Sequence, residues 1–250
     1  MDEQTSGQCD DRATTIDRLR SWTITECKLV PWGSNYTFAV VLADPDADES
    51  DESAEPMLGI YKPRAGETPL WDFPSGTLYQ REQASYLLSV ELGWEFIPPT
   101  VIRDGPHGIG TVQQYVEPET DSHYFDFRAE HQDELRVMAL FDLVTNNADR
   151  KAGHCFRDVR QRKIWGIDHG LTFNMQPKLR TVIWDFCGEE IAPLLIAGLT
   201  RIHDDKAIAD LLTPHLDPLE VQALRMRAAH LIESGVYPEL SSRRNIPYGW

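Results

Sequence analysis

The pattern of apolar residues changes near residues 113–120, and this change constrains the fold more than any other feature of the chain. Before it, short apolar runs such as "MLGIYKP" at 57–63 alternate with segments rich in Gly and Pro, which is typical of strands and turns. After it, apolar residues recur every three or four positions, as over 131–147, which is typical of amphipathic helices. We therefore expect an α+β protein with a strand-rich first part and a mainly helical second part.

Local signals predict individual elements in both parts. Apolar runs flank a turn over 24–44 and again over 100–116, so two strands are expected in each segment. One helix is expected in the strand-rich part, over 80–94. In the second part, helical patterns lie over 131–147 and near 189–199, 204–214 and 217–234. Asp217 suits the N-cap of the last helix, and Gly235 suits its C-terminal end.

Two polar segments are expected to be flexible. Residues 1–18 are polar and predict a flexible N-terminus. The segment "DPDADESDESAEP" at 44–56 has many like charges and no large apolar residue, which predicts a solvated, flexible acidic loop.

The composition of the chain disfavours several classes of function. A formal net charge of −16 at pH 7 lacks the basic footprint of a general nucleic-acid binder and disfavours docking on an anionic membrane surface. No apolar run reaches membrane-spanning length and no signal-peptide pattern opens the chain, so we expect a cytoplasmic protein. The four cysteines form no C-x-x-C pair, which favours reduced structural thiols. A nucleotide site stays compatible with this charge, because local cations can hold phosphate inside an acidic protein.

Candidate phosphate-binding groups lie in the strand-rich part. Lys62 ends an apolar strand and Glu82 opens the next helix, where a carboxylate could fix the ammonium as kinases do around ATP phosphates. Gly33, Ser34 and Asn35 form a turn that could present N–H groups and a hydroxyl to phosphates. Each feature also has an ordinary structural interpretation: a snorkelling surface lysine, an acid favoured at a helix start, and a hairpin turn without ligand.

Two aspartates on short loops of the helical part are candidates for phosphoryl-transfer chemistry. Asp149 lies in "NNADRK" after a helix, where it could orient the proton of an attacking hydroxyl. Asp168 follows the short strand "KIWGI", where it could bind Mg²⁺ through oxygen. Phosphoryl transfer needs mainly positioning and charge neutralisation, so these two carboxylates would suffice. For either aspartate alone a turn-forming or capping residue is the favoured interpretation, and only the order of all these motifs favours one mechanism.

Several strings resemble a known group of kinases. "GIYKP", "REQASYLL", "NNADRKAGH" and "GIDHGLTF" resemble the phosphatidylinositol 3-/4-kinase-like superfamily, which includes type II phosphatidylinositol 4-kinases and HipA-type atypical kinases. With "GETPLWDFPSGTLYQRE", the chain resembles a bacterial phosphatidylinositol 3-/4-kinase-related family over roughly residues 20 to 190. The resemblance implies a bilobal protein-kinase-like fold with an antiparallel-sheet N-lobe over 19–116, a mainly helical C-lobe over 117–250, and ATP in the cleft.

The resemblance also implies residue roles. Lys62 would bind the α/β-phosphates and Glu82 would anchor it. Asp149 would be the catalytic-loop aspartate, Arg150 would brace that loop, and Asp168 would hold the metal ion. The hinge beside the adenine would be formed, mostly through backbone, by Gln114, Tyr115 and Val116.

One position departs from the family pattern. Kinases of this type usually carry an asparagine, their second metal ligand, five residues after the catalytic aspartate, and here that place holds His154. Imidazole is a poor Mg²⁺ ligand but suits transition metals. Three interpretations stay open: His154 binds Mn²⁺ or another metal, it contacts phosphate as a cation, or the site is weakened. A purely structural histidine is the remaining alternative.

These observations together predict an ATP-dependent phosphotransferase that uses Mg²⁺ or Mn²⁺. We expect its acceptor to be a hydroxyl of a protein or a soluble small molecule, because no anchor or basic amphipathic stretch points to a lipid surface. The alternatives are a nucleotide-binding pseudokinase with little turnover and an AMP transferase that binds ATP in reverse.

Overall fold

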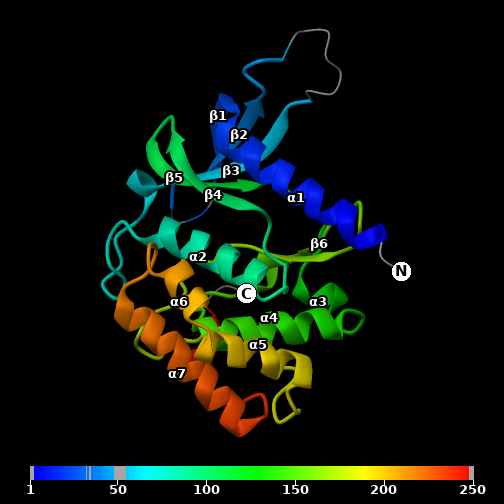
Figure 1. The fold of residues 1–250 in the computed structure, drawn as a ribbon, viewed down its shortest axis with the longest axis vertical. Helices are drawn as coiled ribbons and strands as arrows, with labels where there is room; N and C mark the ends of the chain where they lie inside the picture. Colours follow the sequence, from blue (N-terminus) through cyan, green and yellow to red (C-terminus); the bar gives the residue numbers. More distant parts are fainter. Residues whose placement is uncertain (1–2, 32, 34, 48–54, 248–250) are drawn as a thin grey trace. The chain divides into compact units, whose positions relative to one another are not determined.

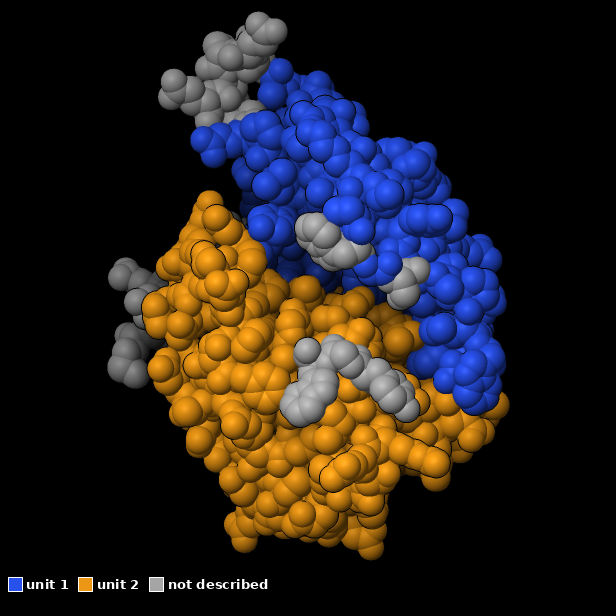
Figure 2. Space-filling model, turned by 180° about the vertical axis from the view of Figure 1, so that it is seen from behind, with its two compact units in different colours: residues 1–83, 98–116 blue, residues 84–97, 117–250 orange. Residues whose placement is uncertain are grey.

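The chain divides into two compact units. The computed structural model describes residues 3–31, 33, 35–47 and 55–247, and for residues 3–11 it describes the backbone only. Unit 1 comprises Met1–Gln83 and Pro98–Val116, and unit 2 comprises Ala84–Ile97 and Glu117–Trp250 (Figure 2). The first unit thus ends at the residue where the apolar pattern of the sequence changes.

Unit 1 is built on one antiparallel sheet of five strands (Figure 1). The strand order is β1-β2-β3-β5-β4, so strands that follow each other along the chain are neighbours in the sheet, except β3 and β4, which β5 separates. This confirms the mixed α+β class and the antiparallel sheet predicted from the sequence. The strands are β1 Thr23–Leu29, β2 Phe38–Ala43, β3 Met57–Pro63, β4 Thr100–Gly105 and β5 Gly108–Gln114. The predicted flexible acidic loop 44–56 lies largely outside the described residues.

One face of the sheet buries apolar side chains beneath the helix α1, Glu3–Ser21, which packs along β4 (Figure 1). The prediction of a flexible terminus over 1–18 did not include this helix. Its large apolar residues lie in and after the last turns, at Ile16, Leu19 and Trp22, which gave a weak periodic signal. The buried core of this unit consists of Leu19, Trp22, Val40, Leu42, Tyr61, Val101 and Val112.

The helix α2, Leu78–Glu91, follows the short 3-10 turn η1, Arg64–Gly66, and an irregular segment. Its N-terminus is capped from a distance, because the backbone N–H of Tyr79 donates to Glu67 Oε1 at 2.9 Å. The guanidinium of Arg81 is buried and lies over the ring of Phe73, 5.1 Å from its centre. These contacts hold the first turns of α2, which carry Glu82, within unit 1.

Unit 2 is mainly helical, as predicted. Among its helices, α5 and α7 pack against each other and α7 also packs on α4 (Figure 1). Its elements are α3 Tyr124–Phe127, α4 Gln132–Thr145, η2 Ala152–His154, β6 Cys155–Arg157, β7 Ile164–Gly166, α5 Pro193–Asp204, α6 Lys206–Leu212, α7 Pro218–Ser234 and η3 Arg243–Asn245.

The ends of α7 confirm the capping signals. Asp217 accepts a hydrogen bond from the Leu219 N–H, Glu220 completes a capping box, and Gly235 ends the helix with φ +67°. The helix predicted over 189–199 begins later, at Pro193, because proline at the first turn starts α5. Within the described part of the chain, no helix combines the length and the apolar character that crossing a membrane requires.

Candidate functional site

The loop that carries Asp149 is shaped by the end of α4. Asn146 ends this helix in the left-handed region, with φ +57°, and its side-chain amide donates to the backbone oxygen of Gln176 at 2.7 Å. The Asp149 N–H donates to Asn147 Oδ1 at 3.0 Å, while Asn147 Nδ2 donates to Asp142 Oδ1 at 2.8 Å. The two asparagines of "NNADRK" therefore set the backbone path that presents Asp149.

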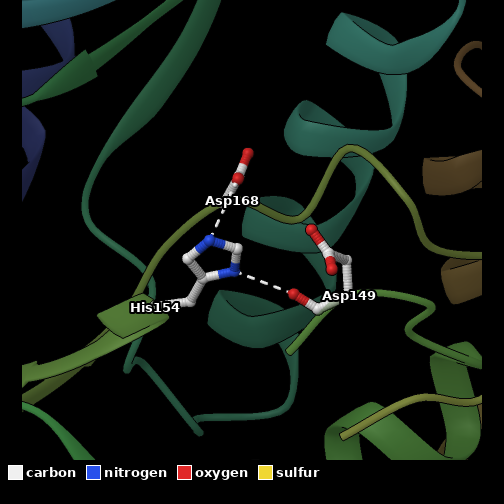
Figure 3. Close-up of side chains that lie close together, drawn as sticks. All are labelled: Asp149, His154 and Asp168. Atoms are coloured by element: carbon white, nitrogen blue, oxygen red, sulfur yellow. Dashed lines mark hydrogen bonds and ion pairs between the residues drawn. The ribbon is translucent and has the colours of Figure 1, made fainter. Parts of the chain in front are cut away.

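Asp149, His154 and Asp168 converge in unit 2 (Figure 3). One possible ligand atom from each residue lies within 4.8 Å of the other two. His154 Nδ1 lies 2.8 Å from the backbone oxygen of Asp149, and Nε2 lies 3.3 Å from Asp168 Oδ2. The side chain of Asp168 is 48% exposed, so a solute can reach the cluster. The expected meeting of the two aspartates is confirmed, whereas their roles stay predictions.

The backbone of Asp168 is in an uncommon conformation. Its φ is +62°, in the left-handed region that non-glycine residues seldom adopt. Such residues cost about 1–3 kcal/mol and concentrate at functional sites, where the surrounding structure holds them. His169, which follows, is fully buried and anchors this turn. The strained turn directs the Asp168 carboxylate toward His154 (Figure 3).

The imidazole of His154 is held in one orientation. A carbonyl oxygen only accepts, so His154 Nδ1 donates to the backbone of Asp149, and Nε2 faces Asp168. Burial lowers the pKa of His154, and the neighbouring Asp168 carboxylate offsets this only in part. The neutral ring that burial favours carries its lone pair on Nε2, which can bind a cation.

Arg150 links the loop that carries Asp149 to the loop that carries Asp168. Its side chain is fully buried and binds the carboxylate of Asp142 through Nε and Nη2. Its Nη1 donates to the backbone oxygen of Ile167 at 3.1 Å, and its Nη2 donates to His169 Nε2 at 2.6 Å. Burial opposes the charged form, yet the Asp142 carboxylate raises the pKa of Arg150. Arg150, predicted among the catalytic residues, is thus placed to position the loops and is not exposed to a substrate.

Three residues of this site were not predicted from the sequence. Lys151 pairs with Asp149 at 2.9 Å and its side chain is 34% exposed; its place directly after Asp149 and Arg150 was the available signal. Asp142 is a charged residue on the buried face of α4, which is itself a signal of a buried polar network. His169 is fully buried, and its contact with Arg150 leaves no trace in a sequence pattern.

Unit 1 contains the predicted ion pair. Lys62 Nζ donates to Glu82 Oε1 at 2.6 Å, and the Glu82 side chain is only 4% exposed. Lys62 lies on β3 opposite Thr111 of β5, so the sheet fixes its backbone. A charge-assisted bond to a buried carboxylate holds the ammonium in one position, whereas a snorkelling surface lysine would be mobile. The pairing is confirmed, and its role toward a nucleotide stays a prediction.

Several of the predicted turn and hinge residues make hydrogen bonds within unit 1. Gly33 has φ +112°, Ser34 lies outside the described residues, and Asn35 Oδ1 accepts a hydrogen bond from the Thr68 N–H at 2.8 Å. The N–H groups of Gln114 and Tyr115 donate to the backbone oxygens of Pro99 and Leu58. Contacts of these residues, and of Val116, with a nucleotide stay predictions.

The fold of the chain is similar to that of solved atypical-kinase structures. The chain is similar to the Golgi casein kinase, with a TM-score of 0.53 and 13% identity over 89% of this chain and 74% of that one. It is also similar to hydra Fam20 in a structure with sugar, with a TM-score of 0.57 and 14% identity over 89% of this chain and 88% of that one. A further structure of the Golgi casein kinase contains Mn/ADP and gives a TM-score of 0.52. At these identities the likeness concerns the fold alone.

A relative by sequence places the chain in a family. No family model matches the sequence. The chain belongs to the family of Protein Rv2133c of Mycobacterium tuberculosis, to which it is 32% identical over an alignment of 284 residues that covers 99% of this chain and 95% of the relative.

Proposed function

We propose that the protein is an ATP-dependent phosphotransferase that moves the γ-phosphate of ATP to a hydroxyl group. The observation that carries this proposal is the convergence of Asp149, His154 and Asp168, whose possible ligand atoms all lie within 4.8 Å of one another. The atypical-kinase-like fold supports it, because phosphoryl transfer on kinase folds depends on carboxylates, a lysine and a divalent cation.

Each residue of unit 2 has a role in this proposal. Asp149 accepts or orients the proton of the acceptor hydroxyl. Asp168, with His154, would hold a divalent cation, and when bound this cation would neutralise charge on the transferred phosphate. Lys151, paired with Asp149 and partly exposed, is placed to balance charge as the phosphate moves. Arg150 keeps the two loops at a fixed spacing.

The residues of unit 1 would bind the nucleotide. Lys62, held by the buried carboxylate of Glu82, neutralises phosphate oxygens. The turn and the segment ending at Val116 supply the remaining predicted contacts, from Gly33, Ser34, Asn35, Gln114, Tyr115 and Val116. The proposed cofactors are ATP and Mg²⁺ or Mn²⁺, and the Mn/ADP in the Golgi casein kinase structure supports this pair of ligands for the fold.

The acceptor in this proposal is a protein or a soluble small molecule. A net charge of −16 disfavours activity on an anionic membrane surface. We therefore propose that the phosphatidylinositol 3-/4-kinase-like resemblance reflects shared ancestry and phosphoryl-transfer chemistry, without a lipid substrate. The free thiols of Cys27, Cys155 and Cys187 fit the predicted cytoplasmic location.

Radiolabelled ATP tests the proposal directly. The purified chain is incubated with γ-labelled ATP, Mg²⁺ or Mn²⁺, and a panel of soluble proteins and alcohols, and both ADP release and label transfer are measured. Asp168→Asn keeps the side-chain shape but removes the charge that would hold the metal ion. We expect the rate to fall by about a hundredfold or more, because metal-assisted catalysis is lost. Asp210→Asn, on an exposed position of α6, is the matched control. Full activity in Asp168→Asn would contradict the assignment.

The pseudokinase is the second candidate, because His154 stands where an asparagine is expected. Thermal unfolding with ATP, with and without the cation, reports binding independently of turnover. A raised melting temperature without label transfer would select the pseudokinase. Incorporation of α-label instead of γ-label would select AMP transfer.

A further inference from the structure

His154 is already oriented for binding a metal ion. Its Nδ1 donates to the backbone oxygen of Asp149 at 2.8 Å, which leaves Nε2 directed at Asp168 Oδ2 at 3.3 Å (Figure 3). Metal-binding histidines usually donate their other N–H to a carbonyl or carboxylate, because that bond fixes the tautomer and the ring orientation. The Asp149 carbonyl occupies this supporting position.

The spacing of the side-chain atoms also suits a shared cation. Ligands bound at about 2.1 Å on neighbouring corners of a coordination sphere lie about 3 Å apart. The Nε2 of His154 and the carboxylate of Asp168 are separated by 3.3 Å, and a carboxylate oxygen of Asp149 completes a group within 4.8 Å. The donors of His154 and Asp168, which come from two loops, thus face one small volume, and the Asp149 carboxylate lies beside it.

The charges around this volume favour a cation. Asp149 and Asp168 contribute two negative charges, and Lys151 at 2.9 Å from Asp149 balances one of them. The guanidinium of Arg150 is buried against Asp142, which neutralises it. A divalent cation would therefore meet carboxylate oxygens, which are anionic donors that attract it.

We propose that His154 gives this site a preference for a divalent transition metal, such as Mn²⁺ or Co²⁺, over Mg²⁺. Mg²⁺ takes oxygen ligands and gives up water reluctantly, whereas imidazole nitrogen suits transition metals. An asparagine at the same place would make an all-oxygen site suited to Mg²⁺. The inference rests on the proposed function, to which it adds the class of the cation.

Metal binding without turnover tests this preference. The affinity of the full chain for Mn²⁺ is measured from the EPR signal of the free ion, and the affinities for Co²⁺ and Mg²⁺ by competition. His154→Asn should lower the preference for Mn²⁺ over Mg²⁺ by about tenfold. His203→Asn is the matched control, since His203 lies on α5 with a 46% exposed side chain and pairs with Asp204. An unchanged preference in His154→Asn would overturn the inference.

A spectroscopic readout on the unmodified chain reports the contact between His154 and the metal ion directly. Pulsed EPR of bound Mn²⁺ should show the ¹⁴N coupling of a directly bound imidazole, retained in His203→Asn and absent from His154→Asn. If Mn²⁺ binding depends on Asp168 but shows no such coupling, the role of His154 is overturned while the proposed function stands. If Asp168→Asn binds Mn²⁺ as tightly as the unmodified chain, the inference and the proposed function both fail.

Discussion

Arg150 and Asp142 form an ion pair in which neither side chain is exposed, with Nη2 and Oδ1 3.0 Å apart. The carboxylate also accepts hydrogen bonds from Asn147 Nδ2 and Thr181 Oγ1. A buried ion pair contributes little net stability when its desolvation is counted, but its geometry is well defined. Here the pair joins α4 to both loops of the candidate site, so we interpret it as the frame that sets their spacing.

Removing one partner of this pair should destabilise the fold. Asp142→Asn leaves the Arg150 guanidinium buried without a counter-charge, and we expect the free energy of unfolding to fall by about 3–5 kcal/mol. Urea denaturation measures this change. Asp133→Asn on the same helix is the control, because its side chain is 98% exposed and the change should stay within about 0.5 kcal/mol. Equal effects of the two substitutions would show that the pair does not stabilise the fold.

The double variant Arg150→Met with Asp142→Leu should separate stability from metal binding. Replacing both charges by apolar groups removes the uncompensated charge, so much of the lost stability should return. The tie between the Asp149 and Asp168 loops would still be absent, and Mn²⁺ affinity should remain lower by about tenfold. Recovery of both properties would contradict a positioning role for Arg150.

The ion pair of unit 1 gives a third prediction. Lys62→Met leaves Glu82, with a 4% exposed side chain, without its cation, and should cost about 1–3 kcal/mol of unfolding free energy. Adding Glu82→Gln should recover part of that stability but none of the lost affinity for ADP, measured by calorimetry. Lys28→Met is the control, because Lys28 is 79% exposed in its pair with Glu26. Unchanged ADP affinity in Lys62→Met would remove Lys62 from the proposed nucleotide site.

Much of the fold was predictable because its signals are local. The antiparallel strands and the caps of α7 at Asp217 and Gly235 follow from apolar period, capping residues and turn chemistry. The helix α1 was not predicted because its sequence has a weak apolar pattern. Among its described side chains, only Ile16 and Leu19 contribute to the core. Packing on the sheet therefore stabilises this helix more than its own sequence pattern does.

The site was predictable only in its charged residues. Asp149 and Asp168 stand out by motif and spacing, and the structure brings them together. The residues that hold these aspartates in place are brought together by tertiary packing. Arg150 contacts Asp142, eight residues earlier in the sequence, and His169, nineteen residues later. Long-range hydrogen bonds of buried polar groups leave no periodic trace, so a single sequence does not indicate which arginine is buried.

Two glycines near the candidate residues should differ in how much stability they lose on substitution by alanine. A Cβ at Gly110 would lie 2.3 Å from the backbone oxygen of Lys62, and backbone atoms cannot move aside cheaply. We expect Gly110→Ala to cost about 1–3 kcal/mol through overpacking, measured by thermal or urea unfolding. A Cβ at Gly153, close to His154 in the chain, would meet no atom within 4 Å, so Gly153→Ala should stay within about 0.5 kcal/mol. The reverse order of costs would contradict the close approach of β3 and β5.

The turn between β6 and β7 predicts a dependence of stability on pH. Burial by itself raises the pKa of Asp158, but hydrogen bonds from the Gln161 N–H, the Trp165 indole and the N–H groups of Arg160 and Lys163 outweigh it and hold the pKa below its ordinary value. A carboxyl group whose pKa is lower in the folded state stabilises the fold above its unfolded pKa of about 3.9. That contribution is lost as the pH falls through the folded pKa.

Asp158→Asn should therefore reduce the free energy of unfolding by about 1–2 kcal/mol at pH 7. The difference between the unmodified chain and the variant should shrink below about pH 4, because the unmodified carboxyl group then becomes protonated while asparagine does not titrate. Urea denaturation across pH 3–7 measures both curves. Asp210→Asn, at an exposed pair with Lys206, should stay within about 0.5 kcal/mol throughout. A difference for Asp158→Asn that is as large at pH 3 as at pH 7 would show that the effect comes from side-chain shape and not from the charge.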